Sequence, residues 1–150
     1  MKKWIILIFS IHFLLTGCKT NRRIATPEHF SNVMRKNEYI VKNMIRKYQN
    51  NLSIEAAVIA MKEDLRIEYY KTDNENRAAA MFDINKEKCR RNRENKVSEE
   101  NENSEDYSKY VLKTNFRYKV VARLKNTLIY VDVPLSEETK IREVLEEIKY

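Results

Sequence analysis

The chain of 150 residues contains few of the residue types that carry catalytic or metal-binding chemistry. Beyond residue 18 it has one histidine, His29, and one cysteine, Cys89. A zinc site requires three or four His, Cys or carboxylate ligands at suitable spacing, and this chain does not supply such a set. It also lacks a glycine-rich phosphate loop and a Gly-x-Ser-x-Gly elbow. Carboxylates are plentiful, but none lies in a context that marks an acid-base pair. We therefore expect no enzymatic activity, no metal and no cofactor.

The role of Cys89 stays open on the sequence alone. Its neighbours Lys88, Arg90 and Arg91 would lower the pKa of the thiol. A nucleophile also needs a base held rigidly beside it, and the charged segment around Cys89 offers no such scaffold. We favour an incidental thiol, or an intermolecular disulfide in an oxidising compartment, over a catalytic nucleophile.

Surface charge is the remaining candidate for binding chemistry. The chain has 29 basic and 22 acidic residues and a net charge of +7, which favours anionic surfaces and says nothing about the fold. The candidate polyanion-binding residues are Arg90, Arg91, Arg93, Lys113, Arg117, Lys119 and Arg123. The alternative is that a strand face is charged for solubility and to prevent pairing at a sheet edge.

The N-terminus has the layout of a secretory signal. Lys2 and Lys3 precede a mostly apolar run from Trp4 to Leu15, and small residues follow before Cys18. This run is too short to span a bilayer, which needs about 20 apolar residues.

Residues Leu15, Thr16, Gly17 and Cys18 resemble the lipobox of bacterial lipoproteins. The resemblance implies that residues 1–17 are removed and that Cys18 becomes the acylated first residue, with covalent acyl chains such as palmitate as its membrane anchor. Two or more chains hold a protein stably on a membrane. An uncleaved anchor or an ordinary secretory signal would also place the remainder outside the cytoplasm. Lys19, in place of an Asp, favours the outer membrane or cell surface over the inner membrane.

Export narrows the expected function. We expect a lipid-anchored bacterial envelope protein that acts as a non-enzymatic interaction or adaptor domain with a protein partner or an anionic surface. The alternative is a surface-exposed lipoprotein that binds a glycosaminoglycan, an envelope polysaccharide or an anionic lipid through a basic strand face. Nucleic acid is not expected as the natural ligand. The oligomeric state is left open.

The first half of the domain is expected to be helical. Residues 18–26 have no apolar period and are expected to be a tether. Thr26, Pro27 and Glu28 predict a helix start, and an apolar stripe extends this helix to about Gln49. Ser53 is expected to cap a second helix that ends between residues 66 and 70, although 66–71 also fits a strand. The state of residues 66–84 is open.

A charge-segregated block follows, with bases in 86–96 and acids in 97–106. Its low apolar content predicts a mobile loop or disordered insertion over about 86–106, or a frayed helical hairpin.

The C-terminal third predicts an antiparallel hairpin and a helix. Residues 110–124 alternate between an apolar and a basic face, and residues 127–133 form a second strand after a turn at Lys125 and Asn126. This register places Leu124 opposite Thr127 and Lys119 opposite Asp132 on the outer face. Pro134 ends the strand, and Ser136 is expected to cap a final helix whose apolar stripe is Ile141, Val144, Leu145 and Ile148. The expected fold is therefore a single α+β domain over 27–150, with two N-terminal helices, a charged loop, a hairpin and a C-terminal helix. Because the domain lacks glycine, Asn is expected at its left-handed positions.

Overall fold

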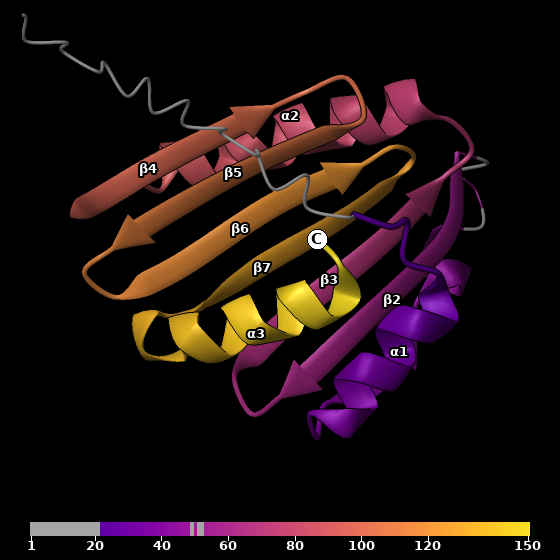
Figure 1. Cartoon of the computed structure of the whole chain (residues 1–150), viewed down its shortest axis with the longest axis horizontal. Coiled ribbons are helices and arrows are strands. Elements are labelled where there is room, and N and C mark those ends of the chain that lie inside the picture. The colour runs from indigo at the N-terminus through magenta and orange to yellow at the C-terminus, as the bar shows by residue number, and fades with distance from the viewer. Residues whose placement is uncertain (1–21, 49, 51–52) are drawn as a thin grey trace, which may run out of the picture.

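The computed structural model describes residues 22–48, 50 and 53–150, and over these ranges the fold is α+β (Figure 1). Its helices are α1 (Pro27–Lys36), α2 (Glu75–Arg91) and α3 (Glu138–Ile148), with 3-10 turns η1 (Ile45–Tyr48) and η2 (Leu135–Glu137). Its strands are β1 (Ile40–Asn43), β2 (Ile54–Lys62), β3 (Leu65–Thr72), β4 (Lys96–Asn103), β5 (Tyr107–Thr114), β6 (Arg117–Leu124) and β7 (Thr127–Pro134).

The seven strands form one antiparallel sheet in the order β1-β2-β3-β7-β6-β5-β4. Helices α1 and α3 cover one face, and α2 covers the other (Figure 1). Each face has its own apolar core, built around Phe30 and Ile141 on the α1/α3 side and around Phe82 on the α2 side. The sheet is therefore buried on both faces over its central strands.

The predicted second helix is wrong, because Ile54–Lys62 is strand β2. Its side chains alternate between the two cores: Ala57 belongs to the α2 side, whereas Val58 and Ala60 belong to the α1/α3 side. A strand buried on both faces is apolar at nearly every position, so its sequence also satisfies a helical stripe. Ser53 precedes this strand and caps no helix.

The first helix begins as predicted but ends early. The Thr26 hydroxyl oxygen accepts the His29 backbone N–H at 3.1 Å, and Pro27 takes the first turn. The helix ends at Lys36, and Glu38 turns the chain with a positive φ of 66°. The apolar residues beyond it continue the helical spacing but lie in β1, in η1 or between them. Met44, which joins the two elements, and Tyr48 pack on the α2 side.

Two segments that the sequence did not place, residues 66–84 and the charged block over 86–106, both form regular secondary structure. Residues 66–72 belong to β3, and 75–84 begin α2. The block over 86–106, expected to be a loop, forms the end of α2 and the edge strand β4. Its opposite charges do lie against each other, since Arg90 Nε is 3.6 Å from Glu99 Oε1, but as a helix and a strand rather than a helical hairpin. The block was expected to be a loop because it has few apolar residues. Strand β4 forms nevertheless, because it pairs through its backbone with β5.

The C-terminal third is partly as predicted. The register of β6 and β7 is confirmed, with Leu124 opposite Thr127 and Lys119 opposite Asp132. The expected long strand over 110–124 is instead the β5–β6 hairpin, with its turn at 115–116. This turn reverses the facing of even positions, so Tyr110 lies in the α2-side core and Tyr118 in the α1/α3-side core.

The chain ends in the predicted helix with a different start. Turn η2 precedes α3, whose N-cap position is Glu137 without a side-chain hydrogen bond, so Ser136 is not the cap. The expected stripe of Ile141, Val144, Leu145 and Ile148 is buried.

The left-handed positions differ from the prediction. The positive-φ residues among those described are Glu38, Glu63, Asn95, Lys125 and Lys149, so Asn takes one of five. Glutamate and lysine accept a conformation that costs an L-residue about 1–2 kcal/mol.

Candidate functional site

The basic strand residues do not form one exposed surface. Lys113 faces the α1/α3 side, where its Nζ lies 2.6 Å from Glu138 Oε1. Arg117 and Lys119 share the carboxylate of Asp132 on the α2 side, at 2.7 and 3.4 Å. Arg123 is buried and donates to the backbone oxygen of Glu105 at 2.9 Å. The expectation that Lys119 and Asp132 lie on an outer, solvated face is wrong, since Lys119 is buried.

The other three basic candidates lie at the end of α2 and just beyond it. Arg90 forms an ion pair with Glu87 at 2.9 Å and lies 3.6 Å from Glu99, so carboxylates of the domain itself compensate its charge. Arg91 and Arg93 are exposed. The seven predicted residues are thus divided between both faces of the sheet, the interior and one helix end.

Cys89 lies in the α2-side core and not in a mobile loop. Burial raises the pKa of its thiol to about 11, an effect larger than the lowering by Lys119 and Lys88. A buried thiol that stays protonated is a poor nucleophile and is not placed for an intermolecular disulfide. Across the described residues, no group of three or more His, Cys, Asp and Glu side chains is arranged to hold a metal ion.

Residue Cys18, the signal segment 1–17 and the tether as far as residue 21 lie outside the described residues. The remaining part of the expected tether packs on the domain. Arg22 lies over the Tyr107 ring at 3.6 Å from its centroid, and the buried Ala25 carbonyl accepts the Tyr69 hydroxyl at 2.7 Å. Any free tether therefore ends before Arg22.

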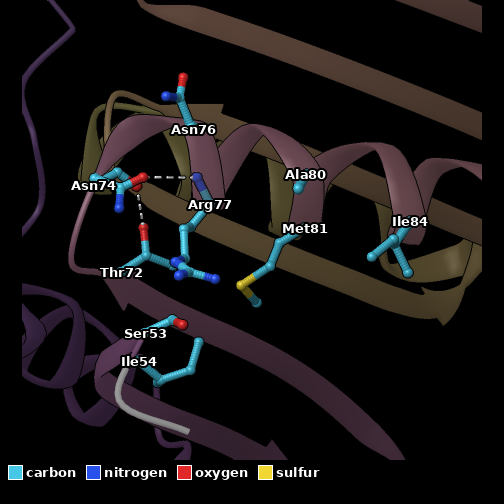
Figure 2. Close-up of a pocket in the computed structure, with 9 residues that line it drawn as sticks. All are labelled: Ser53, Ile54, Thr72, Asn74, Asn76, Arg77, Ala80, Met81 and Ile84. Carbon is cyan, nitrogen blue, oxygen red and sulfur yellow. Dashed lines mark hydrogen bonds between the residues drawn. The ribbon is translucent and has the colours of Figure 1, made fainter.

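A groove of about 520 Å³ lies between α2 and the adjoining ends of β2 and β3 (Figure 2). We call it the α2 groove. Its lining residues are Ser53, Ile54, Thr72, Asn74, Asn76, Arg77, Ala80, Met81 and Ile84. In Figure 2, Arg77 and Met81 extend from the helix toward β3, and Asn76 points away from it.

The polar end of the α2 groove is built by the start of α2. Asn74 caps the helix, its Oδ1 accepting the Arg77 backbone N–H at 3.0 Å. The Thr72 hydroxyl donates to the Asn74 carbonyl at 2.7 Å, and the Asp73 N–H donates to the Ser53 carbonyl at 3.0 Å. These bonds fix the strand-to-helix junction against the start of β2. Arg77 Nε lies 3.5 Å from Asp73 Oδ1.

The apolar end is formed by Ile54, Met81 and Ile84. Ile84 is 67% exposed, Met81 is partly buried, and Ile54 belongs to the α2-side core. The apolar surface of the core thus continues outward along one side of α2. The arrangement joins an apolar surface to amide and guanidinium groups, which suits recognition of a mixed ligand better than bond-breaking chemistry.

Sequence reasoning missed this groove. Asn74 before the apolar segment 78–84 is an N-cap signal that could have placed α2. The wall of the groove opposite α2 is formed where Ile54 begins strand β2. The apolar spacing of residues 54–65 predicted a helix there, so this wall was not expected.

Searches against protein-family models, curated proteins and solved structures find no match to this chain. Within residues 22–48, 50 and 53–150, no helix is long and apolar enough to cross a membrane.

Proposed function

We propose that this chain is a lipid-anchored bacterial envelope protein, on the outer membrane or cell surface, whose domain is a non-enzymatic interaction module. A partner polypeptide docks in the α2 groove as an extended segment that presents an apolar side chain and a carboxylate. The observation that carries this proposal is the groove itself, in which the exposed Ile84 lies on the same wall as Arg77.

The apolar end supplies affinity. Ile84 keeps most of its surface in water, and Met81 beside it has a flexible side chain that adapts to differently shaped partners. Burial of apolar surface contributes about 25 cal/mol for each Å² removed from water. An apolar side chain between Ile84 and Ile54 would cover this surface and extend the α2-side core.

The polar end supplies orientation. The Arg77 side chain is 57% exposed, and its contact with Asp73 is an exposed pair of the kind worth about 0–1 kcal/mol. A partner carboxylate can therefore replace Asp73 at little cost and gain a bidentate guanidinium contact. The N-terminal end of α2 also favours a negative group. The Asn74 amide, which accepts the Arg77 N–H at 3.0 Å and donates to Asp73 at 3.1 Å, holds this end of the groove in place.

The lipobox supplies the location. Acylation at Cys18 would keep the domain at a membrane surface, where a partner held by the same membrane is present at high effective concentration. A groove of modest affinity then suffices for a specific complex.

Site-specific photocrosslinking tests this function in cells. A photoreactive residue replaces Ile84, or replaces Phe116 as the matched control, since the two are 67% and 71% exposed on different parts of the domain. We expect one discrete product from position 84, at least tenfold weaker when Arg77→Glu is added, and absent from position 116. The same product from both positions, or no product from position 84, would contradict docking in the groove.

A further inference from the structure

A crevice of about 340 Å³ lies between α1 and the outermost strand β1. Its helical wall includes Glu28, Asn32 and Arg35, and its strand wall is formed by Val41, Asn43 and Val58. We call it the β1 crevice. Helix α1 lies along this end of the sheet, on the face opposite α2 (Figure 1). The β1 crevice shares no lining residue with the α2 groove.

Strand β1 has one open edge. It comes first in the strand order of the sheet, and across the part of the chain that the structure describes it pairs with β2 alone. Successive residues of an antiparallel strand point their N–H and C=O groups alternately toward and away from the paired strand. The Met44 N–H donates to the Ala57 carbonyl of β2 at 2.7 Å. Because Val41 and Asn43 alternate with the residues bonded to β2, their backbone groups point outward, to the open edge.

The same two residues line the crevice with their side chains. Val41 lies opposite Ala60 and Asn43 lies opposite Val58, and both β2 residues belong to the core on the α1/α3 side. Side chains at opposed positions of neighbouring strands share one face of the sheet, so Val41 and Asn43 also face α1. A strand added to the edge would therefore hydrogen-bond to Val41 and Asn43 and place every second side chain over the crevice.

The helical wall carries opposite charges at its two ends. Glu28, Asn32 and Arg35 follow one another at steps of four and three residues, which places them along one side of α1. Glu28 and Arg35 are exposed, and among the described residues neither forms an ion pair. Seven residues of helix separate them by about 10.5 Å, too far for one to neutralise the other. Arg35 Nη1 donates to the uncharged Asn32 Oδ1 at 3.4 Å.

The path of the chain relates these charges to the direction of an added strand. A short turn at 37–39 joins α1 to β1, so β1 runs back alongside the helix, with Arg35 near its start and Glu28 near its end. Every pair of neighbouring strands in the sheet is antiparallel. A strand added antiparallel to β1 would therefore run in the direction of α1, from Glu28 toward Arg35.

We infer that the β1 crevice binds an extended polypeptide segment, added antiparallel to β1, with a basic, an apolar and an acidic residue at alternate positions. The basic residue pairs with Glu28, the apolar residue covers Val41, and the acidic residue pairs with Arg35. Residues i and i+4 of a strand are about 13 Å apart, and their long side chains reach inward to charges about 10.5 Å apart. This site is separate from the α2 groove, so the domain can hold two polypeptides at once.

The test titrates the full-length protein, in a maltoside detergent, with the capped peptide acetyl-Thr-Lys-Thr-Val-Thr-Glu-Thr-amide. Nuclear magnetic resonance follows the backbone amide signals of Val41 and Asn43, and we expect saturable shifts. N-methylation of the peptide's valine removes an N–H that faces β1 and should weaken the affinity at least fivefold. N-methylation of the threonine after it is the matched control, because that N–H points away from β1, and should change the affinity less than twofold.

Charge variants test the recognition separately. Glu28→Gln and Arg35→Gln should each weaken peptide binding at least threefold, whereas Lys42→Gln, an exposed cation on the other face of β1, should not. A peptide with its lysine and glutamate exchanged should also bind at least threefold more weakly. The inference is overturned by unshifted Val41 and Asn43 amides, by equal effects of the two N-methyl groups, or by equal binding of the exchanged peptide. Shifts with protein concentration alone would also overturn it, since a second copy of the chain would then be the occupant.

Discussion

Lys119 lies directly opposite Asp132 on β6 and β7, with its Nζ 3.4 Å from Asp132 Oδ2. Arg117 holds the other oxygen of the same carboxylate at 2.7 Å. Asp132 thus forms ion pairs with two cations at one end of the α2 face. The basic row of β6 is therefore part of the internal structure of the domain, and a ligand would have to displace Asp132 to reach it.

Removal of Asp132 should destabilise the domain. In Asp132→Ala, the buried Lys119 and the partly buried Arg117 lose their carboxylate, and an uncompensated buried charge is costly. We expect the free energy of unfolding to fall by about 3 kcal/mol in urea titrations, the lower end of the range for a buried pair, because the Asp132 side chain is 28% exposed. Glu55→Ala, which breaks the exposed Lys71–Glu55 pair of 2.6 Å, is the control and should cost under about 1 kcal/mol. Equal losses in the two variants would show that Asp132 has no such role.

Glycine at a left-handed position should stabilise the fold. Glu63 has φ of 50° in the β2–β3 turn, whereas its neighbour Asp64 is not among the positive-φ residues. Glu63→Gly removes the left-handed penalty but adds freedom to the unfolded chain, for a net gain of about 0.5–1 kcal/mol. Asp64→Gly should only lower the stability, because it adds freedom to the unfolded chain and removes no left-handed penalty. Thermal unfolding of both variants measures the difference, and a lower melting temperature for Glu63→Gly than for the unaltered chain would refute the argument.

Cys89 should make stability fall at alkaline pH. Its pKa is raised to about 11 by burial, above the ordinary value of 9.0, so between these values the thiol ionises in the unfolded chain but not in the folded one. Its contribution to stability is therefore complete below pH 9 and is lost as the pH rises toward 11.

The comparison with Cys89→Ala isolates this effect from the buried tyrosines, which both proteins share. Between pH 8 and pH 10 the unfolding free energy of the unaltered protein should fall by about 1 kcal/mol more than that of the variant. Parallel pH profiles in urea titrations would mean that the thiol ionises alike in both states.

The sequence predicted best where local signals agree with each other. The N-cap at Thr26 and the β6–β7 register are confirmed, because a capping hydroxyl and a short turn between alternating strands are local features. The buried stripe of α3 is confirmed for the same reason. These elements frame the α1/α3 face of the sheet.

The remainder depends on pairing between distant segments. Strand β2 is apolar on both faces and therefore satisfies a helical period, and its true state follows from pairing with β1 and β3. Strand β4 has a polar sequence and exists through its hydrogen bonds to β5. One wall of the α2 groove is the start of β2, so the groove could not be located from the sequence.

The intact mass of the protein, recovered from the membranes of bacteria that express it, tests the proposal that this domain is an anchored envelope module. We expect a chain that begins at Cys18 and carries the added mass of a diacylglyceryl group, with Cys18→Ala abolishing both cleavage and modification. A mass that retains residues 1–17, or a mature chain with an unmodified Cys18, would contradict it.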